Sequence, residues 1–419
     1  GCRNFLFLSL FSERKEENSM KKLLVLAIVL RLLVSAFLFH PDIKTYNFQA
    51  SFLKKGVVNI YSYLVENKAS LPLKDEFVYF PLTYFILGGY QMIAFGILGS
   101  GFDLWLADAG ASSVVNNPNI FKYLAILKFP YLILDVGIAF LLLSYFKDRK
   151  KGEKAFTLWL FNPFTILIIY IFSNIDIFSV LLTLIAFLFI KREKLLKASV
   201  FLGLASCFKL YPLLFIPFLF LEGKDLKEKI LVSVIPIFIL LVVILPFWSP
   251  AFVQSALISG LTTRIFNPGF VIGFGESIIV GFFILSALFF YSWITDKKIN
   301  LFNYWTVFLL LIFSFSHFHV AWLLWVAPFI VISAVKRPSL SLPIFILTTL
   351  AVVIPMFYQD RSMTISLFRL YTTWYDLLPT PFVVLQKLYD PYNFISVLHS
   401  ALAGGSLIIS YHILKEEKE

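Results

Sequence analysis

Long apolar runs recur from one end of this 419-residue chain to the other, and they restrict its fold more than any other feature. A helix that crosses a bilayer needs about 20 mostly apolar residues, whereas barrel strands are short and alternate in polarity. The runs therefore predict an all-α polytopic membrane protein and exclude a β-barrel, a coiled coil and a disordered chain. They cover residues 22–39, 82–101, 121–146, 155–172, 176–190, 198–221, 230–248, 269–294, 301–316, 319–335, 341–357 and 394–414.

Composition agrees with a membrane protein. The hydrophobic share is 59% and the charged share 15%, against about 45–50% and about 25% in soluble domains. The net charge is +11, but the basic residues form short clusters between apolar runs, which indicates orientation by the positive-inside rule rather than binding of nucleic acid. The two cysteines, Cys2 and Cys207, do not suggest a disulfide framework.

The basic clusters predict the topology. Five of them are expected in the cytoplasm: 147–154, 191–197, 222–229, 295–298 and 336–337. If every apolar run crossed the membrane a single time, the five clusters would lie on both sides. All five clusters lie on one side if two of the runs are exceptions. We expect 82–101 to lie flat on the outer surface and 198–221 to form a hairpin that turns near Lys209–Pro212, because proline breaks a helix.

This topology has about 12 transmembrane helices, with both termini in the cytoplasm and the long loops at the outer face of the cell membrane. Residues 1–21 are then an N-terminal cytoplasmic tail or the product of a mis-called start, and the first outer loop spans 40–120. Loops on a rigid scaffold commonly carry function, so we expect the active site at the outer face.

The first outer loop holds the most distinctive pattern. Asp42 follows the first span at the water boundary, where a carboxylate is a general base, a metal ligand or simply a solvated loop residue. Residues 43–56 have the spacing of an amphipathic surface helix that ends at Gly56. The sequence F-x-Y-x-P-x-x-Y at 77–84 then begins a second surface helix, with its proline in the first turn.

This order of span, aspartate, surface helix and F-x-Y-x-P-x-x-Y resembles the first outer loop of GT-C superfamily glycosyltransferases, especially the polyprenyl-phosphate-mannose-dependent mannosyltransferases. Residues 161–163 followed by 173–176 resemble the family's "NP … (R)GN-x-D" segment. Residues 205–212 resemble its "A-x-x-x-K-x-x-P" turn. The resemblance covers roughly 22–221, which it identifies as a catalytic GT-C-like module, and it leaves 222–419 as a variable C-terminal transmembrane module.

Three departures from the family pattern leave the metal dependence and the sugar open. The first loop has one aspartate at the position where many relatives have an acidic pair. No Arg-Gly precedes Asn174, and the sequence Asn-Ile-Tyr at 59–61 replaces the commoner Asn-Pro-Tyr.

The resemblance implies roles for particular residues. Asp42 would deprotonate the acceptor hydroxyl, which attacks the anomeric carbon as the polyprenyl phosphate leaves. Contact with the donor phosphate is expected from the cationic or imidazole side chains of Lys209, His317, His319 and Arg264. Asp176 and Asn174 are expected to support the first loop or to hold an optional divalent metal. The candidates for substrate contact are Tyr79, Tyr84, Tyr211, Trp374 and Arg361.

The predicted function is therefore transfer of a sugar, expected to be mannose, from a polyprenyl-phosphate-sugar donor to a lipid-linked glycan or glycolipid, among membrane lipids. One alternative is a transporter or lipid flippase, which predicts an inverted repeat and paired broken helices. A second is an assembly subunit without activity. Within the spans, Arg31 and Asp135 are expected to pair with each other or with Asp176, because a lone buried charge is costly.

Overall fold

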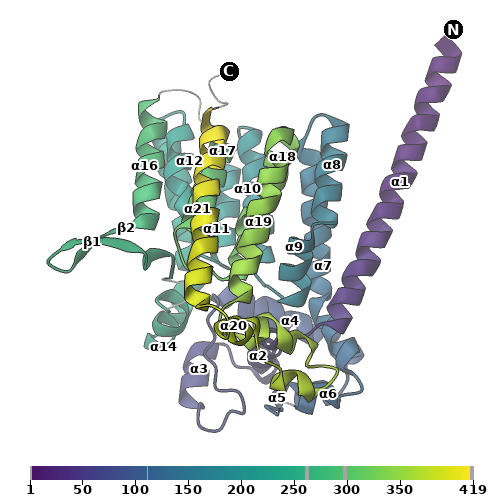
Figure 1. Ribbon diagram of the computed structural model, residues 1–419, viewed down its shortest axis with the longest axis vertical. Coiled ribbons are helices and arrows are strands. Elements are labelled where there is room, and N and C mark those ends of the chain that lie inside the picture. The colour runs from purple at the N-terminus through teal and green to yellow at the C-terminus, as the bar shows by residue number, and fades with distance from the viewer. Residues whose placement is uncertain (1, 111, 260–263, 296–299, 416–419) are drawn as a thin grey trace.

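The long apolar runs form helices that stand side by side in one bundle (Figure 1). The computed structural model describes residues 2–110, 112–259, 264–295 and 300–415. The bundle helices are α1 (Cys2–Phe37), α7 (Ile120–Tyr145), α8 (Arg149–Leu160), α9 (Pro163–Ile166), α10 (Ile177–Lys191), α11 (Leu195–Ser206), α12 (Ile216–Glu222), α13 (Leu226–Ile244), α16 (Val280–Ile294), α17 (Leu301–Ser314), α18 (Leu323–Lys336), α19 (Ser341–Met356) and α21 (Pro391–Lys415).

The helices fit an integral membrane protein. Within the described part of the chain, five helices are long and apolar enough to cross a bilayer, or seven if each of two bent helix pairs counts as one span. Six further apolar helices have 10–17 residues, shorter than a span of about 20. Length and apolarity alone therefore account for fewer crossings than the 12 that the sequence predicts.

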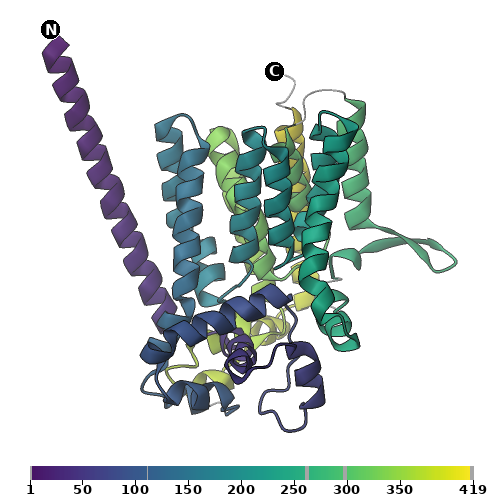
Figure 2. The same cartoon turned by 180° about the vertical axis from the view of Figure 1, so that it is seen from behind.

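A layer of shorter helices covers one end of the bundle, opposite the first turn of α1 and the last turn of α21 (Figures 1 and 2). Its helices are α2 (Pro41–Ala50), α3 (Ile60–Glu66), α4 (Pro81–Leu98), α5 (Gly101–Ala107), α6 (Ser112–Val115), α14 (Pro250–Phe252) and α20 (Pro381–Gln386) (Figure 1). The connecting segments contain the short helical turns η1 (Ser51–Lys55), η4 (Leu245–Phe247), η5 (Val253–Leu257), η6 (Arg264–Phe266), η7 (Val320–Trp322), η9 (Arg361–Met363), η10 (Ile365–Phe368) and η11 (Thr373–Leu377).

Helix α4 is apolar and long enough to cross a membrane, yet it lies across the end of the bundle (Figure 2). It approaches the preceding surface helix closely, because a Cβ atom at Gly88 would lie only 2.8 Å from the Ala50 carbonyl oxygen. The first surface helix also agrees with the prediction: α2 and η1 end at Gly56, which has a φ of +80°. Glycine adopts this left-handed conformation without steric penalty.

Residues 198–221 turn back on themselves, as the sequence predicts. Leu195 at the start of α11 and Glu222 at the end of α12 line one cavity at the end of the bundle where α1 begins. Lys209, between these helices, lines a different cavity together with Asp42 of the surface layer. The chain resumes in η3 (Tyr211–Phe215), whose second residue is Pro212. The two arms are short, and protein surrounds the apex, where such breaks are tolerated.

One predicted span is wrong over nearly half its length. Residues 269–294 were expected to be one apolar helix, but 269–279 form an antiparallel hairpin of β1 (Gly269–Gly273) and β2 (Glu276–Ile279), and α16 starts at Val280. Three glycines in seven residues weaken a helix here, and valine and isoleucine favour strands. The hairpin projects sideways from the bundle (Figures 1 and 2).

A buried polar network ties α1 to the bundle. The Arg31 guanidinium donates to the Asp135 carboxylate of α7, and both side chains are fully buried. Trp159 Nε1 and the Tyr170 hydroxyl also donate to this carboxylate, at 2.6 and 2.8 Å. Arg31 donates to the carbonyl oxygen of Leu160 at 2.7 Å as well. Arg31 and Asp135 therefore pair with each other and not with Asp176.

Candidate active site

A cavity of about 480 Å³ opens where the surface layer meets the bundle. It collects residues from α2, the loop before α4, the turn before α10, the apex after α11 and the segment that leads into η7. Six predicted site residues line it: Asp42, Tyr79, Asn174, Asp176, Lys209 and His319. Segments nearly 280 residues apart in the sequence thus contribute to one site.

Asp42 lies in the first turn of α2, directly after the break that follows α1. Its backbone N–H donates to Nδ1 of His40, which caps the helix at 3.3 Å. The carboxylate has 54% of its side-chain surface exposed, and its Oδ1 lies 3.7 Å from the same imidazole nitrogen. Burial lowers the pKa of His40, against the opposing effect of the Asp42 and Asp360 carboxylates. Asp42 is thus an accessible carboxylate beside a buried imidazole that is neutral at pH 7.

Lys209 and Asp176, which both line the cavity, form an ion pair. Lys209 Nζ lies 3.6 Å from Asp176 Oδ1, and the aspartate is 3% exposed against 24% for the lysine. The second carboxylate oxygen, Oδ2, accepts a hydrogen bond of 2.8 Å from Nε1 of Trp325 in α18. The ammonium also lies 5.4 Å from the centre of the Tyr79 ring. These contacts hold a partly exposed cation at the cavity wall.

The turn before α10 brings Asp176 to this position. Asn174 Oδ1 accepts a 2.6 Å hydrogen bond from the Asp176 backbone N–H. Ser173 has a φ of +56°, in the left-handed region where most side chains are strained. The Tyr46 hydroxyl of α2 donates to the Ser173 carbonyl oxygen. The turn therefore connects the bundle to the first surface helix through Ser173, while Asn174 holds the backbone at Asp176.

His319 faces the cavity as a neutral imidazole. Burial lowers its pKa, with Asp42 and Asp176 opposing that effect and His40 and Lys209 adding to it. Its Nδ1 accepts a hydrogen bond of 3.2 Å from the Ala321 backbone N–H, so the ring proton is on Nε2. His319 can therefore donate one hydrogen bond to a bound group without carrying a charge.

Among the lining residues that the sequence did not identify as site residues are Tyr46, Gln49, Asp75, Glu76 and Trp322. Asp75 and Glu76 add two carboxylates to the lining of the cavity. The resemblance to the family had pointed to a single aspartate in the first loop, Asp42. The side chain of Gln49 donates to the Asp75 carbonyl oxygen at 2.8 Å and so attaches this loop to α2. Asp75 and Glu76 directly precede the 77–84 motif, and this position was the signal that could have identified them.

The other predicted site residues lie elsewhere. Tyr84 is buried in the surface layer and donates to the Val57 carbonyl oxygen at 2.6 Å. Tyr211 lies behind the cavity, where its ring stacks on Trp325 at 4.3 Å. Arg361 donates to the carbonyl oxygens of Asp376 and Leu378 within its own loop, and Trp374 is 59% exposed. None of the four lines the cavity.

Arg264 and His317 are close to each other but also outside the cavity lining. The His317 ring lies 4.6 Å from the Tyr358 ring. Burial lowers the pKa of His317, and the nearby Arg264 charge lowers it further. The four residues expected to bind the donor phosphate are therefore divided, with Lys209 and His319 at the cavity and the other two apart from it.

In the described part of the chain, no group of three or more His, Cys, Asp or Glu side chains could hold a metal ion. The residues present therefore do not fit the optional divalent metal. Both oxygens of Asp176 already interact, one with Lys209 and the other with Trp325. We therefore derive no step through a metal ion.

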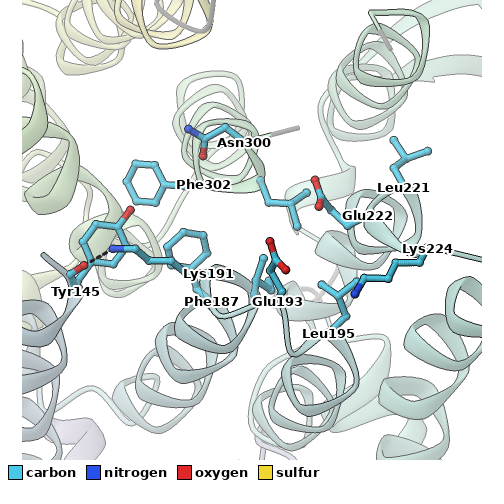
Figure 3. A pocket seen from close by; sticks show the side chains of 12 residues that line it. Tyr145, Phe187, Lys191, Glu193, Leu195, Leu221, Glu222, Lys224, Asn300 and Phe302 are labelled. Carbon is cyan, nitrogen blue, oxygen red and sulfur yellow. Dashed lines mark hydrogen bonds between the residues drawn. The ribbon is translucent and has the colours of Figure 1, made fainter. Parts of the chain in front are cut away.

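A second cavity, of about 640 Å³, lies at the opposite end of the bundle (Figure 3). None of the predicted site residues lines it. Lys191 donates to the Tyr145 carbonyl oxygen and lies 3.8 Å from the centre of that ring. The Glu193 and Glu222 carboxylates point into the cavity (Figure 3). Acidic and basic groups are mixed in this cavity and Lys191 is already hydrogen-bonded, whereas six predicted site residues line the first cavity, which we therefore take as the candidate site.

Comparison with known proteins adds no assignment: no protein-family model, no curated protein and no solved structure matches the chain.

Proposed function

We propose that the chain is a GT-C-type membrane glycosyltransferase that uses a polyprenyl-phosphate-linked sugar, expected to be mannose, and transfers it to a lipid-linked glycan or glycolipid. The observation that carries the proposal is the convergence of an exposed carboxylate, Asp42, with a cation, Lys209, and a neutral donor, His319, in one cavity. A volume of about 480 Å³ is in the range of ligand pockets, about 300–1,000 Å³.

Asp42 would act as the general base. Its carboxylate takes the proton of the acceptor hydroxyl while the oxygen of that hydroxyl bonds to the anomeric carbon. The bond between the anomeric carbon and the phosphate oxygen breaks, and the polyprenyl phosphate leaves as an anion. The half-exposed Asp42 side chain can reach a substrate hydroxyl, as a general base must.

Lys209 and His319 would receive the leaving phosphate. A lysine ammonium stabilises the developing negative charge in a partly buried site, where it is screened less than in water. His319 adds one N–H donor. The Asp176–Trp325 contacts fix the lysine, so its position is set before the substrate binds.

The proposed arrangement in the membrane has about 12 crossings, with the two arms of the 198–221 hairpin counted separately and α4 lying on the surface. The Asp42 cavity then faces the outer side, and the termini are cytoplasmic. A transporter remains the second candidate, because it predicts paired broken helices and the described part of the chain has two bent helix pairs. We favour the transferase because Asp42, Lys209 and His319 line one cavity.

Replacing Asp42 with asparagine tests the proposal. In proteoliposomes with polyprenyl-phosphate-mannose and a mixed lipid-glycan acceptor pool, we expect transfer to fall about 10²- to 10⁴-fold, the usual contribution of a general base. The matched control is Asp103→Asn, because Asp103 is a surface carboxylate that pairs with Lys54 outside the cavity. Substantial activity in Asp42→Asn, or equal loss in both variants, would show that Asp42 is not the base.

A further inference from the structure

The hairpin of β1 and β2 extends sideways from the bundle near the start of α16 (Figure 1). The two strands pair antiparallel, with Phe270 opposite Ile278 and Val271 opposite Ser277. They form a two-stranded sheet, so each strand has one edge without a strand partner. An isolated two-stranded hairpin is marginally stable in water, which indicates that something else supports this one.

Both faces of the hairpin carry exposed apolar side chains. Phe270, Val271 and Ile272 are 66%, 83% and 62% exposed. Because successive strand residues point to opposite faces, these values mean that neither face is packed on the protein. Its only polar side chains are Glu276 and Ser277, at the start of β2. A water-exposed hairpin would carry more polar side chains on at least one face.

The tip contains a phenylalanine where a turn normally has a small or polar residue. Gly273, Phe274 and Gly275 have φ values of +132°, +51° and +85°. Bulky side chains rarely adopt positive φ, so the backbone alone would favour glycine or asparagine at 274. The Phe274 ring is nevertheless fully exposed. An aromatic ring in a strained conformation with no protein contact is best explained by a surrounding that is not water.

We propose that the hairpin lies in the headgroup–acyl boundary of the membrane leaflet next to the Asp42 cavity, with Phe270 and Phe274 reaching toward the acyl chains. The hairpin is continuous with a lipid-facing surface, because β2 leads directly into α16, whose Phe283 is 60% exposed. The open strand edges exclude the hydrocarbon core, where unpaired backbone groups are too costly. Aromatic side chains are favoured in the boundary itself.

This inference does not depend on the proposed enzymatic activity. It assigns to the hairpin a lipid partner, and it fixes the depth of the leaflet relative to the Asp42 cavity. An enzyme or a transporter with this fold would present the same surface to the bilayer.

Spin-label accessibility tests the proposal in the full-length protein. We would place a nitroxide on Phe274→Cys and, separately, on Val271→Cys, in a Cys2→Ser background that keeps the buried Cys207. The control is Ala69→Cys, in an exposed loop of the surface layer. All three are reconstituted in vesicles of phosphatidylcholine and phosphatidylglycerol, and relaxation by oxygen is compared with relaxation by a water-soluble nickel complex.

We expect the oxygen-to-nickel accessibility ratio to be several-fold higher at 274 and 271 than at 69. Ratios at both hairpin positions equal to that at 69 would overturn the proposal, because the hairpin would then be in water. Dipolar broadening at 274 that disappears on dilution with unlabelled protein would also overturn it, because a second copy of the chain would then cover the tip. Two labelled positions guard against a local disturbance by either substitution.

Discussion

At Trp325, one buried indole connects the bundle core to the cavity. Its N–H holds Asp176, and Asp176 pairs with Lys209. Trp325→Phe would keep the stacking on Tyr211 and remove only the donor. A hydrogen bond to a charged group contributes about 1.5–3 kcal/mol, so we expect the KM for the polyprenyl-phosphate donor to rise about tenfold, with a smaller change in kcat, in steady-state transfer assays.

Trp305→Phe is the matched control for this prediction. Trp305 is also buried and stacks on an aromatic ring, Phe215, at 4.0 Å. Its Nε1 has no hydrogen-bond partner among the described residues. If Trp325→Phe and Trp305→Phe have the same KM as the unaltered protein, or if both raise it equally, Trp325 does not position Lys209.

Ser173 gives a prediction on stability. Its left-handed backbone costs roughly 1–2 kcal/mol for a residue with a side chain, whereas glycine loses roughly 0.5–1 kcal/mol more in backbone entropy on folding. Ser173→Gly should therefore raise the free energy of unfolding by about 0.5–1 kcal/mol, measured by thermal unfolding in detergent. Ser173→Ala removes the same hydroxyl but keeps the strain, so a gain of equal size in Ser173→Ala would contradict the backbone explanation.

Single residues could be predicted where a polar side chain interrupts an apolar run or follows it. Asp42 and Lys209 stand out in this way, and both line the cavity. Trp325 could not be found in this way, because a tryptophan in a span is an ordinary feature of such a sequence. Its role depends on a contact with a residue far away in the chain, Asp176.

At the scale of elements, the Arg31–Asp135 ion pair attaches α1 to α7. Asp135→Asn would leave the fully buried Arg31 charge without its carboxylate. Breaking a buried pair in this way costs about 3–5 kcal/mol. We therefore expect a clear fall in the melting temperature of the protein in detergent, and the double change Arg31→Met with Asp135→Leu should recover part of it.

The surface pair of Arg149 and Glu153 serves as the control for this loss. Its Nε–Oε1 distance is 2.9 Å and half of the arginine is exposed. Exposed pairs contribute about 1 kcal/mol or less, so Glu153→Gln should barely change the melting temperature. A loss in Asp135→Asn as small as that in Glu153→Gln would mean that the buried pair does not hold α1.

Elements were predictable where proline or a charge cluster marks a boundary. The turn of 198–221 follows from Pro212, which the structure places at the start of η3. The β1–β2 hairpin was missed because an unbroken apolar run has no periodicity that separates a strand from a helix. Only its glycines carried information, and apolar membrane helices also contain glycine.

For the whole molecule, the ends of the bundle differ in charge pattern. Four of the basic clusters begin or end at or near a residue that lines the cavity in Figure 3. These residues are Tyr145, Lys191, Glu222 and Asn300. Lys336, from the fifth cluster, lies 5.0 Å from the centre of the Tyr145 ring. The clusters therefore meet at the end opposite the Asp42 cavity. Under the positive-inside rule we expect this end to lie in the cytoplasm.

Cysteine accessibility in intact cells checks this orientation. In a Cys2→Ser background, Ala69→Cys lies in the exposed loop after α3, and Lys151→Cys lies at the exposed start of α8. We expect a membrane-impermeant maleimide to label position 69 in intact cells and position 151 only after lysis, since charged reagents do not cross the bilayer. Labelling of 151 but not 69 in intact cells would invert the molecule and place the Asp42 cavity in the cytoplasm. Helix α1 leads the chain to the surface layer and α7 leads it away again. Labelling of both positions would therefore mean that these helices do not place positions 69 and 151 on opposite sides of the membrane.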